Sequence, residues 1–114
     1  MYYLSTCSTC KRIMDEMPET AKVELQDIKT EAITAQQLED MKARAGSYEA
    51  LFSKRAMKYR SLGLHEKELS EEDMRDWILK EYTFLKRPVT IIKDDIYIGS
   101  AKKTVNQFIS ALRS

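Results

Sequence analysis

The two cysteines of the chain, Cys7 and Cys10, form a Cys-x-x-Cys motif. A thiolate is a nucleophile, and a second thiol one helical turn away can attack a mixed disulfide formed on the first. Such a pair cannot supply the four ligands of a structural zinc site, and the single histidine, His65, is far away in the sequence. We therefore expect no metal and interpret the pair as nucleophilic or redox-active.

The residues around the motif predict a strand followed at once by a helix. Tyr2–Leu4 is a short β-prone run, and apolar residues at 10, 13, 14 and 17 recur at the spacing of one helix face. Cys7 then lies at the helix N-terminus, where unpaired N–H groups and the positive end of the dipole favour a thiolate. Lys11 adds positive charge in the first turns. Cys10, on the apolar face, is expected to point inward, either as a resolving thiol or as a packed thiol without redox role.

Hydrophobic spacing along the rest of the chain predicts further strands and helices. In order they are a strand at about 23–27 with Leu25 on its apolar face, a capped helix from Thr34 to Gly46, a short helix at 47–52, an irregular basic segment at 53–64, a helix capped by Ser70, strands at 89–92 and 96–98, and a helix from about Lys102. Thr34 and Ser70 precede the residues that a capping box requires.

This order of elements predicts an α/β protein with a thioredoxin-like fold. The first half is a βαβ unit, whose strands should be parallel, and the second half is a ββα unit. A helical insertion separates them, so we expect a single domain with its core at about 1–30 and 84–114 and the insertion at about 31–83.

A cis-proline precedes the hairpin in that architecture, and Pro88 occupies this place. The residue before the cis-proline lies beside the Cys-x-x-Cys motif, so we expect Arg87 to approach Cys7. A guanidinium can bind a carboxylate or another oxyanion through two parallel hydrogen bonds. Arg87 is therefore a candidate anion-binding residue.

Length and charge exclude several classes of protein. The chain has 114 residues with 19 basic and 18 acidic side chains, a net charge of +1 that gives no overall field to hold nucleic acid or an anionic membrane. No apolar run approaches the ~20 residues of a membrane span. The first residues are too few and too polar for a signal peptide, so we expect a cytoplasmic protein.

Four segments resemble the arsenate reductase (ArsC)/Spx family: residues 3–11, 51–55, 59–64 and 85–89. The resemblance covers nearly the whole chain and implies a glutaredoxin-like, thioredoxin-like core with a helical insertion. It implies that Cys7 is the nucleophile and that Arg87 is the arginine of an Arg-Pro motif. Arg55 stands where Spx-like members carry an arginine. Glutathione as co-substrate and glutaredoxin as partner follow from the same resemblance.

The chain departs from the arsenate reductases where these carry two further arginines. It has Ser53 at one of these places and Tyr97-Ile98-Gly99-Ser100 around the other. We therefore expect little or no reduction of arsenate. The second cysteine, Cys10, makes the motif resemble the Cys-x-x-Cys of the Spx branch, whereas arsenate reductases usually have one cysteine here.

Our interpretation is a thiol-dependent oxidoreductase linked to glutathione, without a bound cofactor. Cys7 attacks, and Cys10, glutathione or a glutaredoxin resolves the mixed disulfide, while Arg55, Arg87 and Lys11 hold an anionic group. The alternative is an Spx-like redox-sensing regulator that binds the RNA polymerase α-subunit without enzymatic turnover. A family member that has lost its activity is a third possibility.

Overall fold

The computed structural model describes residues 1–18 and 23–113 of the chain. It divides into two compact units, the first made of Met1–Glu31 and Arg87–Ser114 and the second of Ala32–Lys86. The first unit holds the Cys-x-x-Cys motif and Arg87. That both units belong to a single domain stays a prediction.

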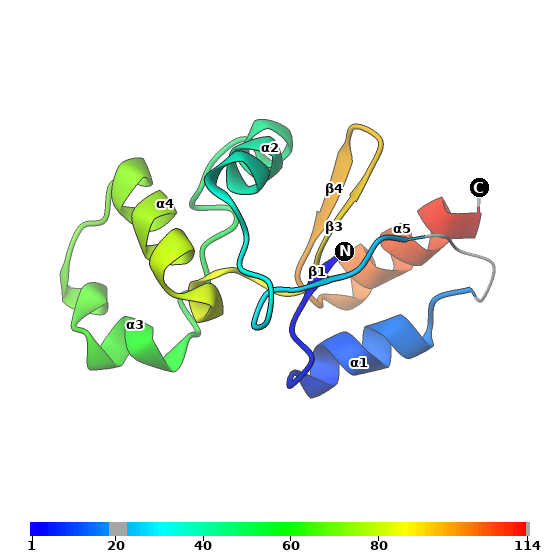
Figure 1. The fold of residues 1–114 in the computed structure, drawn as a ribbon, viewed down its shortest axis with the longest axis horizontal. Coiled ribbons are helices and arrows are strands. Elements are labelled where there is room, and N and C mark those ends of the chain that lie inside the picture. The colour runs from blue at the N-terminus through cyan, green and yellow to red at the C-terminus, as the bar shows by residue number, and fades with distance from the viewer. Residues whose placement is uncertain (19–22, 114) are drawn as a thin grey trace. The chain divides into compact units, whose positions relative to one another are not determined.

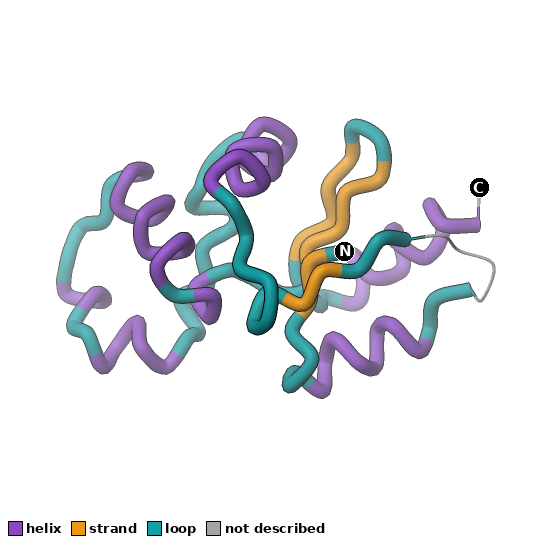
Figure 2. The backbone as a smooth tube through the Cα atoms, in the orientation of Figure 1, coloured by secondary structure: helices purple, strands orange, loops and turns teal. Residues whose placement is uncertain are grey.

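The first unit is built on a four-stranded sheet with the order β2-β1-β3-β4. Its strands are β1 (Tyr2–Tyr3), β2 (Gln26–Asp27), β3 (Val89–Ile92) and β4 (Asp95–Ile98). β1 is parallel to β2 and antiparallel to β3, which confirms the predicted βαβ half. β3 and β4 form the predicted hairpin, with a tight turn at Lys93–Asp94 that Figure 2 shows as a loop joining two strands.

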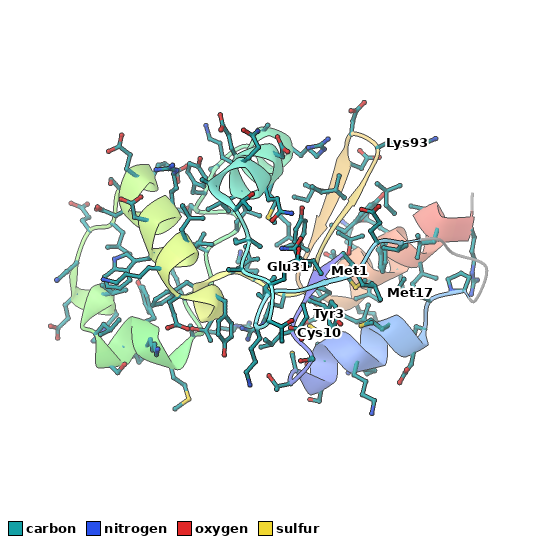
Figure 3. The ribbon with its side chains drawn as sticks, in the orientation of Figure 1. Met1, Tyr3, Cys10, Met17, Glu31 and Lys93 are labelled. Carbon is teal, nitrogen blue, oxygen red and sulfur yellow. The ribbon has the colours of Figure 1, made fainter. Side chains whose placement is uncertain are left out.

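Two helices, α1 (Ser8–Asp15) and α5 (Lys102–Arg113), pack on the same face of this sheet (Figure 1). Ile13 of α1 and Phe108 of α5 meet in a buried cluster that also contains Met1. Tyr3 of β1 packs against this cluster, and Figure 3 labels Met1 and Tyr3 at the start of the chain that leads into α1. The cluster thereby anchors α1 against the strand that precedes it.

The second strand is shorter than the sequence pattern predicts. β2 contains only Gln26–Asp27, because β1 offers only Tyr2 and Tyr3 as pairing partners. The expectation that Leu25 lies on a buried strand face is wrong, since its side chain is 50% exposed. Ile28 is buried instead, and its N–H donates to the carbonyl of Tyr3 at 2.9 Å.

The second unit contains α2 (Ala35–Ala45), α3 (Met57–Ser61) and α4 (Glu71–Lys80), with 3-10 turns at Leu64–Glu66 and Tyr82–Phe84. Thr34 and Ser70 form the predicted capping boxes at the starts of α2 and α4. Gly46 ends α2 in the left-handed conformation with φ 93°. The core of this unit includes Phe52 stacked on Phe84, with ring centroids 5.1 Å apart.

Two predictions for the second unit are wrong. Residues 47–52 form turns instead of a short helix, because the Glu71 carboxylate accepts the N–H groups of Tyr48 and Glu49 at 2.7 and 3.0 Å. The segment 53–64 is not wholly irregular, since it contains α3. Helix α3 buries none of its residues, so the segment carries no apolar periodicity by which the sequence could reveal it.

Candidate active site

Cys7 lies at the junction of β1 and α1, as the N-cap of the helix. Its backbone is extended, with φ −93° and ψ 114°. The Cys7 N–H donates to the carbonyl of Leu4 at 3.0 Å, and its own carbonyl accepts the N–H of Lys11 at 3.2 Å. The side chain is partly exposed, so its sulfur can meet a substrate. The predicted place of Cys7 at a helix N-terminus is confirmed.

The surroundings of Cys7 favour its thiolate. Burial raises the pKa of Cys7, whereas the hydrogen bonds from the N–H of Cys10, the thiol of Cys10 and the N–H of Thr9 lower it. The positive charge of Arg87 acts in the same direction. Because the net effect lowers the pKa, Cys7 is ionised at a lower pH than an ordinary thiol, and the thiolate is the reactive form.

Cys10 has the opposite character. Its side chain is fully buried, as predicted from its place on the apolar face, and Figure 3 shows it at the start of α1. Burial, together with the hydrogen bond to Cys7 and the charge of Cys7, raises the pKa of Cys10 to about 11. Cys10 is therefore a neutral thiol that donates to the Cys7 sulfur, and both cysteines are free.

Arg87 directly precedes Pro88, and the peptide bond between them is cis, as the sequence predicts. Among the described residues, its Nη1 atom is buried and has no hydrogen-bond partner. The charge of Arg87 lowers the pKa of both Cys7 and Cys10, so the guanidinium acts electrostatically on the two sulfurs. A buried donor of this kind gains from pairing with an anion.

The other predicted site residues lie on the surface of their own units. Lys11 is exposed on α1, and Arg55 is exposed in the turn before α3, in the second unit. Their roles in holding an anion stay predictions. His65 is also exposed, and its Nε2 atom lies 3.8 Å from the Glu66 carboxylate.

Sequence reasoning missed one residue next to the motif. Asp27 was predicted only as a strand residue, but its Oδ1 accepts the N–H of Ser5, in the turn before Cys7, at 3.3 Å. It also accepts the N–H of Lys29 at 3.1 Å. The sequence shows only that Asp27 is an acidic residue at the end of a predicted strand. This does not reveal that Ser5 is its hydrogen-bond partner.

The described part of the chain also bears on metals and membranes. Residues 1–18 and 23–113 contain no cluster of three or more histidine, cysteine or acidic side chains that could hold a metal ion. Within the same ranges, no helix is both long enough and apolar enough to cross a membrane.

The sequence and the fold of this chain were compared with those of known proteins. A family model described as the ArsC family matches residues 2–108. The YffB protein superposes with a TM-score of 0.82 at 20% identity, covering 97% of this chain and 96% of that one. An arsenate reductase from Vibrio cholerae gives a TM-score of 0.79 at 14% identity, with 93% and 92% covered.

A Staphylococcus aureus protein solved by NMR superposes with a TM-score of 0.72 at 26% identity, and 93% of each chain is covered. No curated protein matches the sequence significantly. The structural likenesses confirm the predicted α/β, thioredoxin-like fold.

Proposed function

The chain belongs to the ArsC family, and from this we propose that it is a thiol-dependent oxidoreductase with Cys7 as its nucleophile. The observation that carries the proposal is the place of Cys7 at the N-terminus of α1, where hydrogen bonds and the charge of Arg87 together outweigh burial and lower its pKa. Family membership supports the redox class, and the geometry supports the choice of Cys7 over Cys10.

In the proposed reaction, the Cys7 thiolate attacks one sulfur of a disulfide. A mixed disulfide forms on Cys7, and the other half of the substrate leaves as a thiolate. Either a glutathione thiolate then attacks the substrate sulfur and restores Cys7, or Cys10 attacks the Cys7 sulfur and releases the second half of the substrate. The second route leaves a Cys7–Cys10 disulfide, which two glutathione molecules or a glutaredoxin reduce.

The state of Cys10 fits a resolving thiol. The negative charge of Cys7 and the hydrogen bond to Cys7 are two of the causes that raise the pKa of Cys10. Both disappear once Cys7 carries a mixed disulfide, so Cys10 loses its proton more readily at that stage. Before the attack, its proton stabilises the Cys7 thiolate.

We assign the anionic part of the substrate or of glutathione to Arg87. Its buried Nη1 atom supports this assignment, because a carboxylate there would pair a donor that the described residues leave unpaired. Lys11, on the same helix as Cys10, is proposed as a further cation of this site, while the anion-binding role that the resemblance gives Arg55 stays a prediction. Arsenate is a poor candidate substrate, because Ser53 and the segment 97–100 supply no guanidinium where the resemblance expects one.

The test is reduction of a mixed disulfide and of arsenate with glutathione and glutaredoxin, using the wild-type protein, Cys7→Ser and Cys10→Ser. We expect turnover of the mixed disulfide by the wild type, none by Cys7→Ser, and arsenate reduction slower by at least the ~10²–10³ that the loss of a single donor costs, relative to an enzyme with the full donor set. Equal turnover by Cys7→Ser and the wild type would refute the assignment.

A redox-sensing regulator that binds RNA polymerase is the second candidate. The hydrogen bond between the Cys7 and Cys10 sulfurs favours it, because two adjacent thiols can be oxidised to an internal disulfide when an oxidant, such as glutathione disulfide or a peroxide, accepts the two electrons. Co-purification with RNA polymerase, together with an absence of turnover in the assay above, would favour the regulator over the enzyme.

A further inference from the structure

Cys7 reaches α1 through a turn made of residues 4–7, closed by the hydrogen bond from the Cys7 N–H to the Leu4 carbonyl. The two ends of this turn are held in place: Leu4 is buried and its N–H donates to the Cys10 sulfur, and the Cys7 carbonyl accepts the N–H of Lys11 in α1. The two middle residues, Ser5 and Thr6, are exposed. Packing therefore does not hold the middle of the turn, and another interaction must do so.

Asp27 contacts this turn from the end of β2. Its Oδ1 accepts the Ser5 N–H at 3.3 Å, and the Ser5 hydroxyl also donates to its carboxylate. The backbone of Asp27 is itself held in place, because Asp27 pairs with Tyr3 in the sheet. Its carbonyl also accepts the N–H of Glu31 at 2.8 Å. The carboxylate thus connects Asp27, which is held in the sheet, to Ser5 in the exposed middle of the turn.

We propose that Asp27 is a positioning residue for Cys7: by holding Ser5, it keeps the turn in the shape that directs the N–H groups of Thr9 and Cys10 at the Cys7 sulfur. The inference rests on the proposed function, because positioning matters only if the Cys7 thiolate reacts. It assigns to Asp27 an effect on a sulfur that its carboxylate does not touch.

Geometry and charge predict opposite effects of removing Asp27. If Asp27 acts through the turn, its loss weakens the hydrogen bonds that lower the pKa of Cys7, and the pKa rises. If its negative charge acted directly on the thiolate, its loss would lower that pKa. The charge named among the causes of the lowered Cys7 pKa is the positive charge of Arg87. The direction of the change therefore distinguishes the two explanations.

The test measures the rate at which iodoacetamide alkylates Cys7 as a function of pH, located by mass spectrometry, in Asp27→Ala and Asp27→Asn. We expect the rate at pH 6–7 to fall roughly tenfold in Asp27→Ala, the scale of one weakened hydrogen bond to a charged group. Asp27→Asn should keep most of the rate, because an amide oxygen can still accept from Ser5.

Glu71→Ala is the matched control. Glu71 also holds a turn, by accepting the N–H groups of Tyr48 and Glu49, but it lies in the second unit. Its loss should lower stability without changing the pH profile of Cys7. A merely structural role for Asp27 predicts the same outcome for Asp27→Ala as for Glu71→Ala.

If the alkylation rate of Cys7 at pH 6–7 is unchanged or higher in Asp27→Ala, the positioning role is overturned. A lowered Cys7 pKa in both Asp27 variants overturns it as well. If Asp27→Ala does not fold, Ser5→Ala decides: it removes only the hydroxyl donor, and we expect a smaller fall in the same direction. No fall in Ser5→Ala then refutes the inference. Because alkylation does not require turnover, these outcomes are separate from failure of the proposed function, which appears as turnover in Cys7→Ser.

Discussion

Replacing Arg87 by lysine keeps a positive charge beside Cys7 but removes the planar set of N–H donors. In the wild type, Nη1 of Arg87 is buried and unpaired within the described residues, so an anion that reaches it gains a charged hydrogen bond without breaking another one. Such a bond contributes about 1.5–3 kcal/mol. We therefore expect the affinity for glutathione or sulfate to fall roughly 10- to 150-fold in Arg87→Lys.

The pKa of Cys7 should respond differently from the affinity. It should change little in Arg87→Lys, because the ammonium replaces the charge that lowers it, and it should rise in Arg87→Met, which removes that charge. Calorimetric titration with the anion measures the affinity, and alkylation against pH measures the pKa.

Arg113→Lys provides the control for this experiment, since it makes the same change at an exposed arginine at the end of α5. It should alter neither the affinity nor the pKa. If Arg87→Lys binds the anion as tightly as the wild type, Arg87 does not hold the anion, and the reasoning from its buried Nη1 atom is wrong.

Three further predictions concern thiol order, backbone and charge. At pH 6–7, Cys7 should be alkylated before Cys10, and the opposite order in a mass-spectrometric assay would exchange their roles. Gly46→Ala should lower the free energy of unfolding by about 1–2 kcal/mol, because φ is 93° although an added Cβ meets no atom within 4 Å; an unchanged urea midpoint would contradict this. Lys58 lowers the pKa of Glu81, so their pairing stabilises the fold above the ordinary carboxyl pKa and is lost as the pH falls through the lowered value. Lys58→Met should therefore lower the free energy of unfolding by at most about 1 kcal/mol at pH 7 and leave it unchanged in acid. Urea unfolding at both pH values measures this, and an equal loss at the two would exclude the charge pairing as its cause.

Elements with strong local signals could be predicted from the sequence. The apolar spacing of α1 and α5 is helical because one face of each packs on the sheet, and Ile13 and Phe108 meet there. The capping boxes of α2 and α4 are determined by residues within one turn, so Thr34 and Ser70 mark their starts correctly. For the site, the same local reasoning placed Cys7 at a helix N-terminus and Cys10 on the buried face.

Features that depend on distant partners could not be predicted. The length of β2 is limited by the two residues of β1, and the turn at 47–52 depends on the Glu71 carboxylate. The contact between Asp27 and Ser5 exists because the sheet register places Asp27 opposite Tyr3. No local pattern encodes such a register, since it is set by which strands pair.

The most direct test of Cys7 as the nucleophile is incubation of Cys10→Ser and Cys7→Ser with glutathione disulfide at pH 7, followed by mass spectrometry. Cys7 attacks the disulfide and releases one glutathione thiolate, so Cys10→Ser should accumulate one glutathione on Cys7. Cys7→Ser should stay unmodified, because Cys10 is fully buried, and burial, the largest of the causes that raise its pKa, remains in this variant. Glutathione on Cys10 in Cys7→Ser at a comparable rate, or no adduct on Cys7 in Cys10→Ser, would contradict the assignment of Cys7 as the attacking thiol.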